Sequence, residues 1–221
     1  MVSLEEMKEK SYYSDFMKVA LEKMGVVPDD IKAFMPIVMK KVVESKEKDP
    51  VLMLERILEE LRGEWTASEN IPLHGPWHHI MVPGVIVAAL RNNGNGFTDE
   101  DVKEALKRGT MIPGGTCGFH GTCGAAVGLG IAISIVTRST PYHDDERSMA
   151  MEAVKRSLDK IGRLGGPRCC RLSAYAALEV AGKYLEEKGY NLPISKRVGL
   201  CPIADINKQC HGPRCRYYPN R

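Results

Sequence analysis

The sequence contains no hydrophobic run long enough to cross a membrane. A membrane-spanning helix needs about 20 consecutive apolar residues, and the longest apolar run, from Ala125 to Val136, has only about a dozen and includes two glycines. The N-terminal stretch MVSLEEMKEKSYYSDF also lacks the basic patch and apolar core of a secretory signal. We therefore expect a cytoplasmic protein that makes no membrane contact.

A surplus of charge of one sign is missing as well. The 221 residues include 31 Lys and Arg and 28 Asp and Glu, a net charge of +3, and both signs are interspersed along the chain. Nucleic-acid binding requires a basic surface that neutralises backbone phosphates, so nucleic acid is not an expected partner. The length is sufficient for one domain with a substantial hydrophobic core.

Several common cofactor motifs are absent from the chain. There is no G-x-G-x-x-G after a strand, no G-x4-G-K-S/T phosphate loop, no G-x-S-x-G nucleophile motif and no C-x3-C-x2-C motif of radical enzymes. The sequence therefore gives no direct support for nucleotide binding or for S-adenosylmethionine chemistry.

Strand-like alternation of polar and apolar residues is almost absent, whereas helical spacing recurs throughout. Asp49 and Pro50 are typical of a helix N-cap and first turn, and Thr98 of a second N-cap. Pro83 is expected to kink the helix that contains it. Three helices fit within the first 64 residues, and further helices are expected over residues 75–92, 99–108, from the second GTCG to about 137, 143–162 and 167–188.

These patterns predict a mainly α protein, a single globular helical domain with an irregular, Cys-rich C-terminal segment. Residues 1–66 form an N-terminal helical layer without Cys or His, which can act as a scaffold, dock a protein partner or form a homodimer. Residues 67–221 form a Cys/His-rich catalytic or cluster-binding domain. We expect the two to pack as one unit.

Seven cysteines are unexpected in a protein of the reducing cytosol. Disulfides are rare there, except in some hyperthermophiles, and an odd number cannot all pair. Glycines accompany the cysteines in GGTCGFHGTCG, GGPRCC and CHGPRC. Glycine allows close approach of backbone N–H groups to a thiolate or cluster sulfur, so these stretches are typical of ligand loops.

The cysteine spacings distinguish between kinds of metal site. The chain has C-x5-C, an adjacent CC pair, C-x8-C and C-x4-C, but neither the paired C-x2-4-C of structural zinc sites nor the C-x2-C-x2-C run of ferredoxins. Ligands collected from distant segments suit an iron–sulfur cluster inside a helical enzyme. We expect a 4Fe–4S cluster, with zinc as the alternative.

The cysteines fall into two groups along the chain. Cys201, Cys210 and Cys215 are the best candidates for metal ligands, the alternative being free or redox-active thiols. The second group has three possible roles. It can bind a second iron–sulfur cluster, relay sulfur or electrons as a thiol pair, or pack as small hydrophobic residues. This second group consists of Cys117, Cys123, Cys169 and Cys170.

Histidines near these motifs are candidates for acid–base catalysis. His120 lies between the two GTCG words, which makes it the strongest candidate. His74, His78 and His79 occur in HGPWHH, where one of them can act as a ligand or as an acid or base, the alternative being packing or capping.

The combination of HGPWHHIMVPGVIVAALRNNG, IPGGTCGFHGTCGAAVGLGIAISI, GGPRCCRLS and C-x8-C-x4-C resembles an uncharacterised Cys-rich domain family of methanogenic archaea and other anaerobes. The resemblance covers about residues 70–216 and implies anaerobic metabolism without indicating a reaction. GFHGTCGAAVGLGIA and GLCPIADINKQC are also similar to parts of the iron–sulfur L-serine dehydratases and L-cysteine desulfidases. That similarity implies a cluster whose open iron is a Lewis acid for a leaving hydroxyl or thiol.

The sequence therefore predicts an oxygen-sensitive iron–sulfur enzyme of sulfur or small-acid metabolism, of the lyase, desulfidase or sulfur-transfer type. Its substrate is expected to be a small molecule, with His120 or His78 as the acid–base group. The alternative is a non-enzymatic protein, either metal-binding with zinc or iron–sulfur or a thiol relay, that docks a partner enzyme.

Overall fold

The structure is a computed structural model that describes residues 19, 28–68 and 71–219. No β-strand occurs among these residues, which confirms the predicted mainly α fold, and they form a single helical domain. The helices are α3 (Pro28–Glu44), α4 (Pro50–Glu64), α5 (Trp77–Asn92), α6 (Asp99–Thr110), α7 (Thr116–Phe119), α8 (Gly124–Val136), α9 (Asp144–Leu164), α10 (Cys170–Glu186) and the 3-10 helix η1 (Gly212–Arg214). The first helix expected before residue 28 lies outside the described residues.

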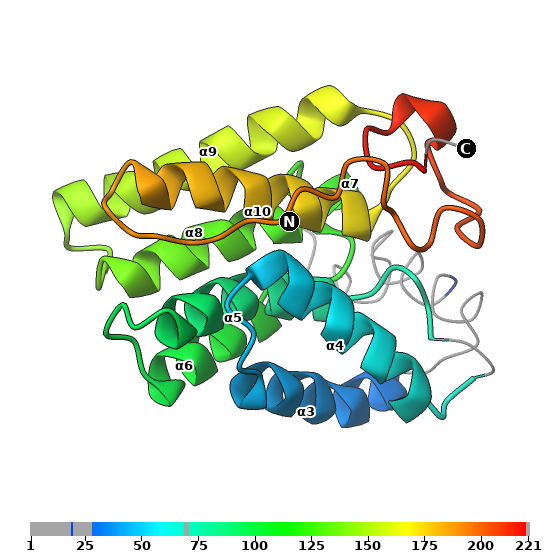
Figure 1. The fold of residues 1–221 in the computed structure, drawn as a ribbon, viewed down its shortest axis with the longest axis horizontal. Coiled ribbons are helices and arrows are strands. Elements are labelled where there is room, and N and C mark those ends of the chain that lie inside the picture. The colour runs from blue at the N-terminus through cyan, green and yellow to red at the C-terminus, as the bar shows by residue number, and fades with distance from the viewer. Residues whose placement is uncertain (1–18, 20–27, 69–70, 220–221) are drawn as a thin grey trace, which may run out of the picture.

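Helix α5 is the centre of the fold. Its sequence WHHIMVPGVIVAAL is apolar on nearly every side, and residues from Trp77 to Leu90 are almost all buried. It contacts α3, α4, α6, α8 and α10. In Figure 1 it lies between α3 and α4 on one side and α8, α9 and α10 on the other. Pro83 is inside this helix and does not end it.

The predicted helix starts are confirmed. The Asp49 carboxylate accepts hydrogen bonds from the N–H groups of Val51 at 2.7 Å and Leu52 at 3.3 Å, and Pro50 is the first residue of α4. Thr98 and Asp101 form a reciprocal capping box at the start of α6.

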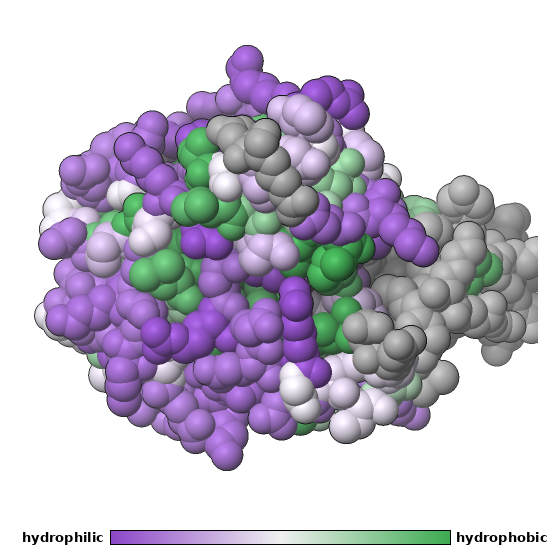
Figure 2. Space-filling model, turned by 45° about the vertical axis from the view of Figure 1, so that its right-hand side comes forward, coloured by the Kyte–Doolittle hydropathy of each residue, from purple (hydrophilic) through white to green (hydrophobic). Residues whose placement is uncertain are grey.

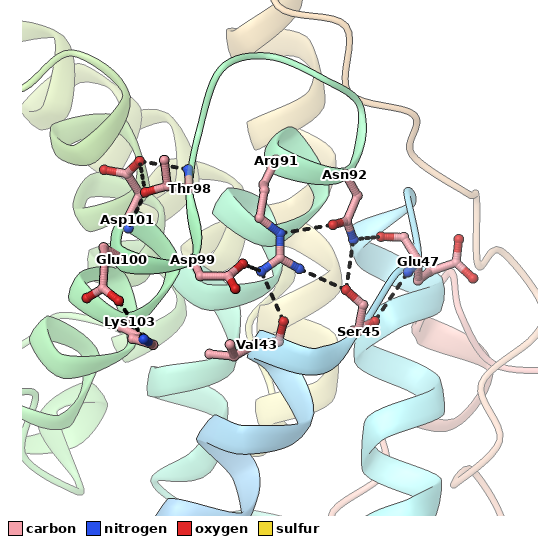
Figure 3. A network of polar contacts seen from close by, with 10 residues as sticks. All are labelled: Val43, Ser45, Glu47, Arg91, Asn92, Thr98, Asp99, Glu100, Asp101 and Lys103. Carbon is pink, nitrogen blue, oxygen red and sulfur yellow. Dashed lines mark hydrogen bonds and ion pairs between the residues drawn. The ribbon is translucent and has the colours of Figure 1, made fainter.

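Arg91 joins the N-terminal helices to the rest of the protein (Figure 3). Its guanidinium donates to the carbonyl oxygens of Val43 at 3.0 Å and Ser45 at 2.8 Å, and to Asp99 at 2.5 Å. Asn92 donates to the carbonyls of Ser45 and Glu47 at 3.0 and 2.7 Å. These contacts connect the end of α5 to the loop between α3 and α4.

Glycines in α8 allow very close helix packing. A Cβ atom at Gly128 would lie 2.8 Å from Pro83 of α5, and one at Gly130 would lie 2.3 Å from Val154 of α9. A Cβ at Gly124, the first residue of α8, would lie 2.2 Å from the His79 ring. The α8 backbone therefore lies directly against α5 at the position of the His79 side chain.

The chain after α10 is irregular, as predicted, and extends back along the helices towards the start of α10 (Figure 1). Asp49 holds this segment at one point, because its second carboxylate oxygen accepts the Ser195 N–H at 2.6 Å. No helix in the part of the chain that the structure describes is long and apolar enough to span a bilayer. The face shown in Figure 2 is mostly hydrophilic, with separate hydrophobic patches.

Candidate metal centre and the thiol group beside it

Four cysteines line one cavity between the start of α10 and the C-terminal segment. Cys201, Cys210 and Cys215, which the sequence predicts as metal ligands, come together here, and Cys169 joins them. We call this site the cysteine cavity. Its volume is about 20 Å³, enough for about one water molecule. The remaining lining residues are Leu172, Tyr175, Ala204, Asn207, His211, Tyr217 and Tyr218.

Backbone hydrogen bonds fold the C-terminal segment so that distant cysteines meet. The Cys201 N–H donates to the Tyr217 carbonyl at 2.8 Å, and the Gly199 N–H donates to the Arg216 carbonyl at 3.1 Å. Because these bonds pair residues 199–201 with 216–217, Cys201 lies beside the chain that carries Cys215. The same segment is thus fixed by its own main chain rather than by a disulfide, and all seven cysteines are free.

The sulfur of Cys169 is surrounded by hydrogen-bond donors. Cys169 is the N-cap of α10, where the first N–H groups of the helix have no helical partner. Burial raises the pKa of this thiol, while hydrogen bonds from the backbone N–H groups of Leu172 and Arg171 lower it. These donors favour a thiolate, the form in which cysteine binds metal.

Two more sulfurs in the cavity accept backbone N–H groups. The Gly212 N–H donates to Cys210 Sγ at 3.4 Å. Burial raises the pKa of Cys201, and a hydrogen bond from the Ile203 backbone and the charge of Arg171 act in the opposite direction. Repeated N–H donation to cysteine sulfur is a property of iron–sulfur sites.

His74 and Asn207 form a chain of hydrogen bonds that ends at Cys169. The Cys170 N–H donates to His74 Nδ1 at 3.4 Å, so His74 must carry its proton on Nε2 and donate it to Asn207 Oδ1 at 3.1 Å. The Gln209 N–H also donates to this oxygen at 3.0 Å. The amide orientation is thereby fixed, and Asn207 Nδ2 donates to Cys169 Sγ at 3.7 Å.

A buried ion pair lies behind the cysteine cavity. Arg171 is 5% exposed and donates to the carboxylate of Glu55 in α4, which also accepts the Tyr175 hydroxyl at 2.5 Å. Arg197 of the C-terminal segment lies 3.9 Å from the same carboxylate. Sequence reasoning missed Glu55, because nothing in the Cys-free N-terminal layer indicates that one of its acids pairs with Arg171 beside the cavity.

The remaining cysteines form a second site, which we call the thiol group: Cys117, Cys123 and Cys170. Cys117 is exposed on α7, while Cys123, the N-cap of α8, and Cys170, the first residue of α10, are half-buried. Burial raises the pKa of Cys170 to about 12; the charge of Arg168 opposes this, and the nearby thiols of Cys123, Cys169 and Cys117 add to it. The adjacent pair Cys169 and Cys170 is therefore divided between two sites.

The four predicted histidines occupy different environments. His78 is 2% exposed, and burial lowers its pKa to about 3, so it is neutral at neutral pH. Its Nδ1 lies 3.1 Å from the Gly75 carbonyl oxygen, while its Nε2 is buried without a hydrogen-bond partner among the described residues. Burial also lowers the pKa of His79. His120 is exposed, next to α7.

No three His, Cys, Asp or Glu side chains in the described ranges converge closely enough to hold a single metal ion. Zinc–sulfur bonds of about 2.3 Å would require sulfurs roughly 4 Å apart around one ion. The ligands of a cluster bind different iron atoms and are spaced more widely. The four thiols of the cysteine cavity therefore line a shared volume without forming a ready-made site for one ion.

A family model with the description "Family of unknown function (DUF5714)" matches residues 38–218. The matched range includes all seven cysteines and all six histidines of the chain. No curated protein and no solved structure matches the chain.

Proposed function

The chain belongs to the DUF5714 family of unknown function. We propose that it is an oxygen-sensitive iron–sulfur enzyme of sulfur metabolism. In this proposal Cys169, Cys201, Cys210 and Cys215 bind a 4Fe–4S cluster. The observation that carries the proposal is the meeting of these four thiols in one cavity. Cysteine thiolates in sets of four are the usual ligands of such clusters.

Hydrogen bonds and charge at the site support the same assignment. A cluster with four thiolates carries net negative charge, and N–H groups from α10 and the C-terminal segment point at its candidate ligands. Arg171 adds a buried positive charge next to Cys201. Donors and cations of this kind stabilise the thiolate form and set the reduction potential.

The number of ligands bears on the chemistry. When bound, a cluster supplies one-electron transfer, or Lewis-acid catalysis if one iron has no protein ligand. Four cysteines leave no iron open, so the arrangement favours electron or sulfur transfer over the small-acid lyase reaction. If Cys169 is not a ligand, the other three leave one iron open and the lyase or desulfidase reaction becomes the better candidate.

A second candidate is a non-enzymatic relay that docks a partner protein. Val198, Leu200 and Ile206 are 45%, 55% and 56% exposed and flank Cys201 in the segment that lines the cavity. Exposed apolar residues next to a redox site suit transient docking. This surface is a more specific candidate for a protein partner than the N-terminal helices.

Metal and sulfide analysis of anaerobically prepared protein tests the proposal. After reconstitution with iron and sulfide we expect about four iron and four sulfide per chain, and a paramagnetic signal on reduction with dithionite. The double variant Cys201→Ser/Cys215→Ser should lose both, while Cys117→Ser, a matched change at an exposed thiol, should retain them. Stoichiometric zinc without sulfide would contradict the proposal and support the zinc alternative.

The relay is tested by changing the apolar surface. We expect Leu200→Asp together with Ile206→Asp to slow cluster reduction by a ferredoxin-type electron donor but not by dithionite, which needs no docking. Equal slowing with both reductants would point to a change in the cluster itself, and no slowing with either would exclude this surface as the docking site.

A further inference from the structure

We propose that Cys123 is a nucleophilic thiol which, with His79 as its base, accepts a sulfane sulfur atom from a persulfide or polysulfide. The inference deepens the proposed role in sulfur metabolism and rests on it for the substrate class. It does not require that the cysteine cavity hold a cluster. The proposed sulfur transfer takes place in the thiol group, which contains Cys170, and not in the cysteine cavity, which contains Cys169.

Close packing of α8 on α5 places the His79 ring against Gly124, the residue that follows Cys123. A Cβ at Gly124 would lie 2.2 Å from His79 Cδ2 and 2.5 Å from its Nε2, so only glycine leaves room for the ring at this position. Gly124 directly follows Cys123, the N-cap of α8. The edge of the imidazole that carries Nε2 therefore lies against the start of the helix where Cys123 is located.

The hydrogen bond at the other ring nitrogen determines what Nε2 can do. His79 Nδ1 lies 3.3 Å from the Ile112 carbonyl oxygen, which can only accept, so the proton is on Nδ1. Nε2 then carries a lone pair and can take a proton from a thiol. Burial also favours the neutral ring by lowering the pKa of His79.

The position of Cys123 at a helix start supports its reactivity. The first N–H groups of α8 have no helical partners, and the helix dipole stabilises negative charge at the N-cap. These N–H groups can donate to a thiolate formed during the reaction. The His79 ring and the first N–H groups of α8 thus both lie within a few residues of Cys123.

The neighbours of Cys123 indicate the kind of substrate. Cys170 lies within range of the charges of both Cys123 and Cys117, so the three thiols belong to one neighbourhood. Acyl or alkyl transfer needs one thiol, whereas transfer of sulfur from thiol to thiol needs several close together. The exposed cation of Arg168 lies beside Cys170 and can bind an anionic persulfide or polysulfide.

The transfer is balanced without an oxidant or reductant. Cys123 gives its proton to His79 Nε2, and the thiolate attacks the outer sulfur of R–S–SH. A new S–S bond forms, the old one breaks, and its electron pair leaves with R–S⁻, which takes the proton from His79. The products are the Cys123 persulfide and R–SH. The same exchange can pass the sulfur on to Cys117 or Cys170.

The experiment treats the full-length protein with inorganic polysulfide under anaerobic conditions at pH 7, traps the products with iodoacetamide, and maps each cysteine by mass spectrometry. We expect an extra sulfur atom on Cys123 first. His79→Gln should slow its appearance at least about a hundredfold, the lower end of the range for loss of a general base. His143→Gln, a matched change at an exposed histidine, should leave the rate unchanged.

Two further variants allow for misfolding of His79→Gln and separate this proposal from that of the cluster. If His79→Gln does not fold, Gly124→Ala retains the histidine but displaces its ring, and it should slow the same step. Repeating the measurement on Cys201→Ser/Cys215→Ser separates the two proposals, because sulfur should still reach Cys123 when the cluster ligands are gone. Sulfur appearing first on the exposed Cys117, or equal rates in wild type and both variants, would overturn the inference.

Discussion

The cysteine cavity and the thiol group differ in how the protein surrounds the sulfurs. In the cavity, three of four thiols accept N–H groups and a buried Arg171 lies close by. In the thiol group, the three cysteines are at the starts of α7, α8 and α10, with a histidine and an exposed arginine nearby. The first environment suits permanent ligands, and the second suits thiols that react.

The histidines of HGPWHH divide in the same way. His74 bonds to Asn207 on the cavity side, and His79 lies against α8 on the side of the thiol group. His78 is buried with the charge of Arg171 and the rings of its two neighbours acting on it. One short motif therefore serves both sites, which explains why its residues could not be given a single role.

The largest expected effect comes from the adjacent pair at the start of α10. Cys169→Ala should remove most of the iron from reconstituted protein, because it deletes a ligand of the cavity. Cys170→Ala, one residue away, should keep the iron, because that thiol faces the other site. Iron and sulfide content of the two variants, prepared in parallel, checks the division. Loss of iron from both would mean that the two sites are one.

The buried ion pair gives the next largest effect. Glu55→Ala leaves Arg171 charged and buried without its partner, and should lower the free energy of unfolding by about 3 kcal/mol or more. Glu59→Ala on the same helix removes only an exposed contact to Arg62 and should change it by about 0.5 kcal/mol or less. Urea denaturation of both variants measures the difference. Similar values would show that the cavity does not depend on this pair.

His78 predicts a dependence of stability on pH. Its pKa is about 3 in the folded protein and ordinarily 6.5. Between these pH values the unfolded chain binds a proton at this residue and the folded protein does not. The stabilisation is complete above pH 6.5 and falls as the pH drops towards 3, by roughly 1 kcal/mol per pH unit. His78→Gln should show a shallower fall between pH 6.5 and 5 in urea denaturation. The exposed His143→Gln should match the wild type.

Asn207 is expected to have the smallest effect of the four. Asn207→Ala removes the amide donor to Cys169 while leaving every candidate ligand in place. A hydrogen bond of about 1 kcal/mol to a cluster ligand corresponds to about 40 mV, so the reduction potential should become more negative by this order. A redox titration followed by paramagnetic resonance measures it. An unchanged reduction potential with full iron content would show that the hydrogen bond from Asn207 to Cys169 does not affect the cluster.

The sequence was sufficient for the helices because local signals determine them. Asp49 and Thr98 cap helices as predicted, and the starts and ends of α5, α6, α9 and α10 lie within a few residues of the expected ones. A kink was expected at Pro83, and the helix continues through this residue with neighbouring helices packed against it. One of these neighbours, α8, approaches Pro83 closely because Gly128 has no side chain.

The candidate sites were only partly predictable, because long-range contacts assemble them. The spacing of Cys201, Cys210 and Cys215 was enough to group them. Nothing local distinguished Cys169 from Cys170, whose opposite assignments depend on how α10 meets the C-terminal segment. Glu55 comes from another helix more than a hundred positions away, as its separation of 116 residues from Arg171 shows. Such contacts have no signal in a single sequence.

The irregular C-terminal segment contributes few residues to the core. Among the described residues, the buried apolar ones after α10 are Leu192, Ile203, Ala204 and Tyr217, so most of the core belongs to the helices. Three of the four cavity cysteines belong to this segment, and the fourth begins α10, so a cofactor bound by all four would tie the segment to the helical body.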